Sequence, residues 1–162
     1  MKFRNIMIPI LILGVVASFI FLNLFAESEG EDAAIKSIMD SFFSYVEFKN
    51  TAKLSKLVAD EVKVERDGVS MNKTKDDFLK RYQVLFDKYA NISIKNIQLG
   101  QISYEGAIAD IGISYEFIGY DLTLNQKVQY SIRRILSFTK IDDSWKICGD
   151  KIEQYSQKDV SG

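Results

Sequence analysis

The stretch that decides the fold runs from residue 107 to residue 117 and reads AIADIGISYEF. Its odd-numbered residues are apolar or aromatic, whereas Asp110, Ser114 and Glu116 occupy even-numbered positions. Because successive side chains of a β-strand point to opposite faces, this alternation predicts a strand with one buried face. We expect that face to carry Ala107, Ala109, Ile111, Ile113, Tyr115 and Phe117.

Strand patterns also lie on both sides of this stretch. We predict four consecutive strands over residues 92–104, 107–119, 123–140 and 144–153, separated by short polar turns such as 119–121. Long strands joined by short turns pair antiparallel. In the third of these strands Arg134 shares a face with apolar residues unless a bulge shifts the register. The inner side of the last strand is expected to carry Trp145 and Ile147.

The residues before these strands have a helical period. Apolar positions three and four apart predict helices over about 31–48, 51–60 and 74–89, the last one opened by a capping box at Thr74. Between the second and third helices, Asp67-Gly68 predicts a tight turn of a short hairpin. The sequence therefore predicts an α+β domain, with three helices packed in a strongly curved antiparallel sheet.

The composition excludes several classes of function. The 162 residues carry 21 Lys and Arg and 22 Asp and Glu, a net charge of −1, which does not suit a nucleic-acid-binding protein. The chain has no histidine and one cysteine, so catalysis through histidine and a histidine or cysteine-cluster metal site are excluded. We expect no cofactor and no metal.

The N-terminal residues predict a membrane segment. Residues 6–25 read IMIPILILGVVASFIFLNLF, a run without charge that follows Lys2 and Arg4 and precedes acidic residues. A run of this length can cross a bilayer, and the positive residues before it place the following domain outside the cytoplasm. Residues 1–26 are thus a signal anchor or a cleaved signal peptide, and residues 27–162 are the domain. The domain is membrane-bound in the first case and secreted or periplasmic in the second.

Three segments carry a family resemblance: residues 45–51 (YVEFKNT), 57–65 (LVADEVKVE) and 143–147 (DSWKI). With the order of elements, they resemble the nuclear transport factor 2-like superfamily, a cystatin-like α+β fold that includes ketosteroid isomerase and SnoaL-like polyketide cyclases. The resemblance covers about 120 residues. It implies a cone-shaped domain with a deep apolar pocket, which often dimerises through the outer face of the sheet.

The expected pocket lining is rich in hydrogen-bond donors. Ligand-binding candidates are the residues that face the predicted interior: Tyr45, Tyr82, Tyr115, Tyr130, Arg134 and Trp145. The resemblance places an oxyanion-donating tyrosine at Tyr45. It also places a catalytic aspartate at the position that Arg66 occupies here, which leaves only Glu65 and Asp67 as candidate bases if the hairpin register differs. No acid is expected to face inward beside Arg134.

Two hypotheses about function follow. The first is a membrane-anchored, extracytoplasmic binding or assembly module that is not catalytic and has an apolar pocket with room for a small apolar ligand. The second is a cofactor-free isomerase, cyclase or dehydratase that acts on a small apolar substrate, with Tyr45 as donor and Glu65 or Asp67 as base. Neither hypothesis names the ligand.

Overall fold

The computed structural model of the protein describes residues 29–158. A boundary between two units of the chain falls between Lys36 and Ser37. The predicted membrane segment, residues 6–25, lies outside the described residues. Among residues 29–158, no helix is both long enough and apolar enough to span a membrane.

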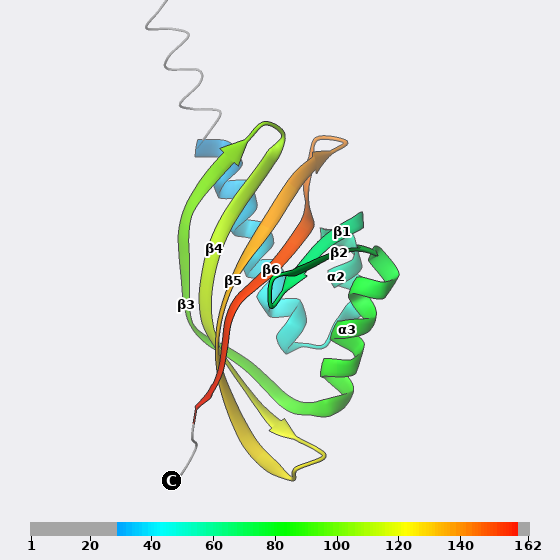
Figure 1. Ribbon diagram of the computed structural model, residues 1–162, viewed down its shortest axis with the longest axis vertical. Helices are drawn as coiled ribbons and strands as arrows, with labels where there is room; N and C mark the ends of the chain where they lie inside the picture. The colour runs from blue at the N-terminus through cyan, green and yellow to red at the C-terminus, as the bar shows by residue number, and fades with distance from the viewer. Residues whose placement is uncertain (1–28, 159–162) are drawn as a thin grey trace, which may run out of the picture. The chain divides into compact units, whose positions relative to one another are not determined.

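The described chain follows the predicted order of helices and strands (Figure 1). Residues 29–47 are helical. The elements that follow are α2 (Thr51–Leu57), β1 (Val58–Arg66), β2 (Val69–Thr74), α3 (Lys75–Lys88), β3 (Tyr89–Glu105), β4 (Ile108–Asp121), β5 (Gln126–Ile141) and β6 (Ser144–Lys158). The predicted α+β class and the three helices are thus confirmed.

The six strands form one sheet in the order β2-β1-β6-β5-β4-β3. Strands β3 to β6 and the pair β1–β2 are antiparallel, but β1 pairs parallel with β6. The prediction of a wholly antiparallel sheet was therefore wrong at this one pairing. The reason is that α3 and four strands separate β1 from β6 along the chain, so no short turn fixes their relative direction.

Local sequence signals explain where two of these elements begin. The hydroxyl of Thr74 accepts a hydrogen bond from the backbone N–H of Asp77 at 3.2 Å, which caps α3 as predicted. Asp67 and Gly68 adopt φ angles of 52° and 76°, the left-handed conformation that a tight two-residue hairpin turn requires. The turn brings β2 back along β1.

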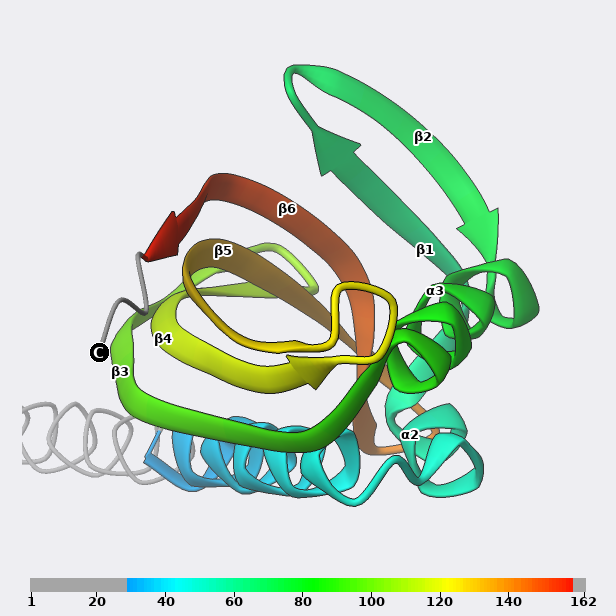
Figure 2. The ribbon, with the colours of Figure 1, turned by 90° about the horizontal axis from the view of Figure 1, so that it is seen from below.

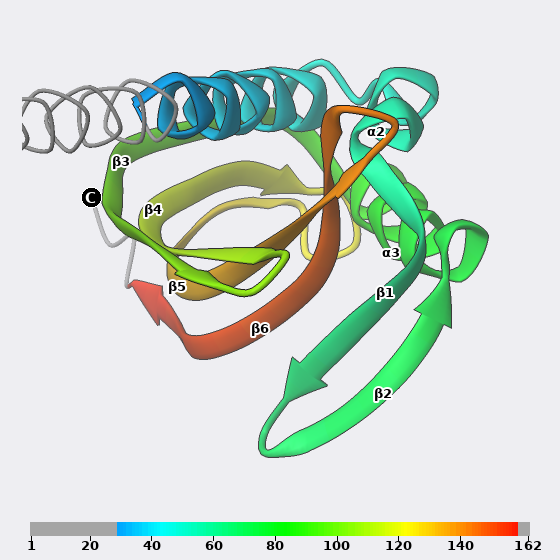
Figure 3. The ribbon, with the colours of Figure 1, turned by 90° about the horizontal axis from the view of Figure 1, so that it is seen from above.

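The sheet is strongly curved, and its concave face holds the core. Figures 2 and 3 show β3 to β6 bent around an interior, with α3 at one side and the β1–β2 hairpin extending beyond the curved part. Phe43 packs edge-on against Tyr115 of β4, with ring centroids 5.1 Å apart, and Phe42 packs against Tyr82 of α3 at 5.8 Å. These contacts join residues of the first helix, α3 and the sheet in one aromatic core.

The inner faces of the strands follow the alternation in most positions. From Ala109 to Phe117 the odd-numbered residues of β4 are buried as predicted. Ala107 is a correction, because it is exposed in the turn before β4. Residues 119–121 are a second correction, because they belong to β4 and not to a turn. The turn follows Asp121, whose carboxylate accepts hydrogen bonds from the N–H groups of Thr123 and Leu124.

Strand β6 contains two irregularities that decide which of its residues face inward. Phe138 pairs with Ile147 and Ser137 with Gly149, so Cys148 is an extra residue without a partner in β5. A second shift lies opposite Arg133 and Arg134. Both have the form of β-bulges, in which two residues of one strand face one residue of its neighbour. The extra residues are in β6, so β5 itself stays regular and Arg134 faces inward.

Candidate functional site

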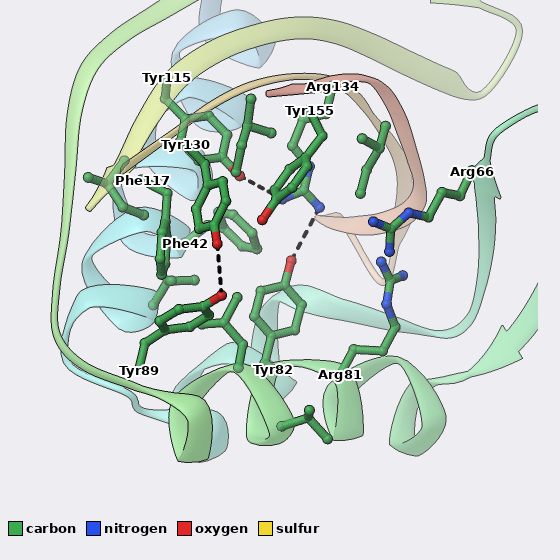
Figure 4. A pocket seen from close by; sticks show the side chains of 16 residues that line it. Phe42, Arg66, Arg81, Tyr82, Tyr89, Tyr115, Phe117, Tyr130, Arg134 and Tyr155 are labelled. Carbon is green, nitrogen blue, oxygen red and sulfur yellow. Dashed lines mark hydrogen bonds between the residues drawn. The ribbon is translucent and has the colours of Figure 1, made fainter. Parts of the chain in front are cut away.

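A cavity of about 400 Å³ lies inside the curved sheet (Figure 4). That volume is in the range of small-molecule sites in proteins. The lining consists of five tyrosines, three arginines, two phenylalanines and six aliphatic residues: Tyr82, Tyr89, Tyr115, Tyr130, Tyr155, Arg66, Arg81, Arg134, Phe42, Phe117, Val46, Val84, Leu85, Ile94, Ile132 and Ile152. The cavity therefore combines an apolar interior with hydrogen-bond donors and positive charge.

At the inner end of the cavity, Arg134 is the centre of a group that we call the buried arginine cluster (Arg134, Asp150, Tyr82 and Tyr115). The guanidinium binds the Asp150 carboxylate through two contacts, Nη2 to Oδ2 at 2.5 Å and Nε to Oδ1 at 3.0 Å. It also donates to the hydroxyls of Tyr115 at 3.1 Å and Tyr82 at 3.2 Å (Figure 4). Arg134 is 6% exposed and Asp150 is 2% exposed.

Burial and charge shift the pKa values of this cluster. Burial lowers the pKa of Arg134, but the Asp150 carboxylate and the two tyrosines outweigh it, and the pKa lies well above its usual value. Burial raises the pKa of Tyr82 to about 12. At neutral pH the guanidinium is charged and the Tyr82 hydroxyl is protonated. The ion pair is then neutral overall, which makes its burial tolerable.

Asp150 is a member of this cluster that the sequence did not predict, and it contradicts the expectation that no acid faces inward beside Arg134. Simple alternation from Trp145 and Ile147 places Asp150 on the outer face. The bulge at Cys148 reverses this alternation, so that Asp150 pairs with Leu136 and points inward. Gly149, the residue between Cys148 and Asp150, lies so close to β5 that a side chain would not fit: a Cβ atom there would lie 2.7 Å from Cβ of Ser137.

A second group of tyrosines forms another wall of the cavity. The hydroxyls of Tyr89 and Tyr130 are 3.4 Å apart, and the rings of Tyr130 and Tyr155 stack with centroids 4.8 Å apart (Figure 4). Burial raises the pKa of both Tyr89 and Tyr155. These hydroxyls are therefore protonated at neutral pH and can serve as donors to a ligand.

The structure brings together some of the predicted site residues and not others. Four of the six ligand-binding candidates line the cavity: Tyr82, Tyr115, Tyr130 and Arg134. Tyr45, which is half-buried beneath Lys53, and the buried Trp145 are not among the lining residues.

The candidate bases also lie away from the lining. Glu65 pairs with Lys151 at 3.1 Å, and the side chain of Asp67 is 93% exposed. The cavity thus does not assemble Tyr45 with Glu65 or Asp67. Within residues 29–158, no group of three or more acidic, cysteine or histidine side chains could hold a metal ion.

Two lining residues that matter were not among the predicted ligand residues. Arg66 continues the inward alternation of Val62 and Val64 in β1, whereas the family resemblance implies for it only the position of a catalytic aspartate. Arg81 precedes the buried Tyr82 on α3. The strand alternation was a signal that could have identified Arg66, whereas a polar residue beside an apolar helical stripe is usually exposed.

The fold is that of nuclear transport factor 2-like proteins. A superfamily protein of this type from Salmonella enterica is 13% identical over 83% of this chain and 96% of its own, with a TM-score of 0.68. A hexachlorocyclohexane dehydrochlorinase, LinA-type3, from Novosphingobium barchaimii is 14% identical over 83% and 94%, with a TM-score of 0.66. A conserved protein from Planctomyces limnophilus is 14% identical over 80% and 99%, with a TM-score of 0.68.

These likenesses confirm the expected resemblance at the level of the fold. No family model matches the chain, and no curated protein matches it in sequence. Because proteins with this fold have different activities, the function has to be argued from the side chains of the cavity.

Proposed function

We propose that this domain binds a small, largely apolar molecule in the cavity and does not transform it. One observation carries the proposal: the sixteen residues that line the cavity include five tyrosines and three arginines, and no aspartate or glutamate. The lining can therefore donate hydrogen bonds and attract negative charge, but it holds no carboxylate that could remove a proton. Donors positioned around an apolar space are typical of a binding pocket.

The other ionisable groups nearby do not supply a base. The raised pKa values of Tyr82, Tyr89 and Tyr155 keep these hydroxyls protonated at neutral pH. Asp150 lies behind Arg134 with a side chain that is 1% exposed, and both of its oxygens contact the guanidinium. A general base must reach the proton that it removes, and these groups do not meet that condition.

A second candidate function is an enzyme that catalyses an elimination. The similar structures favour it, since they include a dehydrochlorinase and a protein described as a dehydratase from Streptomyces avermitilis. In this case Asp150 is the acid nearest to the cavity, and Arg134 would have to release it before it could accept a proton. Turnover that is lost in Asp150→Asn and retained in Glu153→Gln, at a temperature at which circular dichroism shows both variants folded, would favour the enzyme.

We also propose that the domain lies outside the cytoplasm, carried there by residues 6–25. The support is the length of this uncharged run and the basic residues before it. The intact mass of the chain isolated from its own host tests this: a mass that includes residues 1–26 supports an anchor, and a mass without them supports a cleaved signal. Native mass spectrometry of the same material would also test the expected dimer.

The binding proposal is tested by filling the cavity. Ile132 lines the cavity from β5, whereas Ile118 lies on the outward face of β4. We expect wild type and Ile118→Trp to carry or take up a small apolar molecule in native mass spectrometry, and Ile132→Trp to lose it. Equal retention by both tryptophan variants would place the ligand elsewhere and contradict the proposal.

A further inference from the structure

Two arginines face one another at the solvent side of the cavity, and we call them the arginine pair (Arg66 and Arg81). Arg66 ends β1 and Arg81 lies on α3, so the fold brings them together from separate elements. Figure 4 shows the two guanidinium groups pointing toward each other. Their side chains are 58% and 35% exposed, which makes them the most accessible charged groups of the lining.

The acids around the arginine pair do not neutralise it. Arg66 contacts the exposed Asp67 at 3.9 Å, a distance too long for a hydrogen bond. Arg81 Nη1 lies 3.7 Å from Asp150 Oδ2, an atom that Arg134 already binds at 2.5 Å. Within the described chain, this Nη1 atom is buried and has no hydrogen-bond acceptor. The guanidiniums of Arg134 and Arg81 thus share the one buried carboxylate of Asp150, and Arg66 beside them has only the long contact with Asp67.

Such an arrangement is electrostatically unfavourable by itself. Two guanidiniums that face each other repel, and a buried N–H group without an acceptor costs free energy. An anion between them would reverse both effects, because the planar guanidinium forms paired, charge-assisted hydrogen bonds with carboxylate and phosphate oxygens. The remaining lining is aromatic and aliphatic, so the rest of such a molecule would be apolar.

We propose that the ligand is an amphipathic anion, with a carboxylate or phosphate group between Arg66 and Arg81 and an apolar body in the aromatic interior. This inference rests on the proposed binding function and adds the charge and orientation of the ligand. The anionic group lies toward solvent, and the apolar body contacts residues such as Phe117 and Ile94.

The test compares two molecules of almost equal shape that differ in charge. Calorimetric titration of the full-length chain measures the affinity for naphthylacetate and for its neutral amide, naphthylacetamide, with naphthyl phosphate and inorganic phosphate as further probes. We expect naphthylacetate or naphthyl phosphate to bind at least about tenfold more tightly than the amide. Inorganic phosphate shows whether the charged group is sufficient without an apolar body.

The variants Arg66→Gln and Arg81→Gln should remove this preference and lower the affinity for the anions to about that of the amide. The matched control is Arg133→Gln, which removes the same charge from an exposed residue beside Arg134. All of these chains carry the same hydrophobic residues 6–25, so association with that segment cancels in the comparison. Arg133→Gln should bind as wild type does.

The outcomes separate the two proposals. If wild type binds acid and amide equally, or if Arg133→Gln weakens anion binding as much as Arg81→Gln does, the anion inference is overturned and the binding function stands. Tight binding of inorganic phosphate alone, with no gain from the naphthyl group, would overturn the amphipathic part of the inference. If no probe binds to the folded wild-type chain, the proposed function fails as well.

Discussion

The two ends of the cavity use the same type of side chain in different ways. In the buried arginine cluster, Arg134 has a carboxylate and two tyrosine hydroxyls within hydrogen-bond distance. In the arginine pair, Arg66 and Arg81 have only contacts of 3.7 Å or longer with acids. A buried charge whose partners are all supplied by the protein depends on those partners, and removing one of them destabilises the fold. A charge without close partners is available to a ligand.

Loss of Asp150 should produce the largest effect on stability, because Asp150 is the carboxylate that the buried Arg134 binds through two contacts. Asp150→Asn leaves the Arg134 guanidinium buried without its counter-charge, and we expect the free energy of unfolding to fall by about 3–5 kcal/mol. Denaturant titration measures this. The control is Glu153→Gln, which removes the partner of the exposed Arg133 and should cost about 0–1 kcal/mol. Equal losses in the two variants would show that the cluster is not a structural element.

High pH should weaken the same cluster. The pKa of Tyr82 is about 12 in the folded chain and near 10 when the chain unfolds. Because the folded value is raised, the stabilisation is complete below pH 10 and is lost as the pH rises to about 12. We expect a decrease of about 2–3 kcal/mol across this interval from this residue.

Unfolding measurements at several pH values test the contribution of Tyr82. Phenylalanine at this position removes the ionisable hydroxyl, so Tyr82→Phe should show a smaller decrease between pH 10 and pH 12 than wild type. Tyr89 and Tyr155, whose pKa values are also raised, leave a remaining slope in both chains. Identical slopes in the two proteins would contradict the raised pKa of Tyr82.

A methyl group at Gly149 should have a moderate effect, through the bulge that turns Asp150 inward. The added Cβ would lie 2.7 Å from the Cβ and Oγ atoms of Ser137, and we expect Gly149→Ala to cost about 1–3 kcal/mol. Gly112→Ala is the control, since a Cβ there meets nothing within 4 Å. The double variant Gly149→Ala with Ser137→Gly should recover stability; no recovery would mean that the close contact is not the cause.

Arg66→Gln should have the smallest effect on stability. The side chain is 58% exposed and its ion pair is long, so its removal should change the free energy of unfolding by less than about 0.5 kcal/mol. Arg134→Gln, measured beside it, should cost several times more because it leaves Asp150 buried without its partner. If Arg66→Gln lowered the free energy of unfolding by more than about 1 kcal/mol, Arg66 would be a structural residue, and the contrast between the arginine pair and the buried arginine cluster would be lost.

The sequence predicted the elements because each has a local cause. Helical and alternating periods, the cap at Thr74 and the turn at Asp67-Gly68 act within a few residues, and the structure confirms them. Alternation also predicted that Arg134 faces inward. What it could not predict were properties that depend on distant segments, such as the parallel pairing of β1 with β6.

The sequence likewise predicted only those cavity residues that lie in regular parts of the helices and strands. Four tyrosine and arginine candidates follow from the regular parts of α3, β4 and β5. Asp150 follows from an irregular part, since a bulge is fixed by how β6 fits against β5 and leaves no periodic signal in β6 itself. Arg81 lines the cavity because of how α3 packs beside β1, which carries Arg66. This packing joins separate elements, so the sequence around Arg81 does not predict it.

The unpaired Cys148 has a consequence for how sequences of this fold should be aligned. Since Cys148 has no partner in β5, a chain that lacks this one residue keeps Ser137 opposite Gly149 and Leu136 opposite Asp150. In such a chain the last strand would alternate regularly from Trp145 to Ile152, and Asp150 would be visible in the sequence as an inward residue. Deletion of Cys148 would therefore shorten β6 by one residue and still leave Asp150 opposite Leu136, within reach of Arg134.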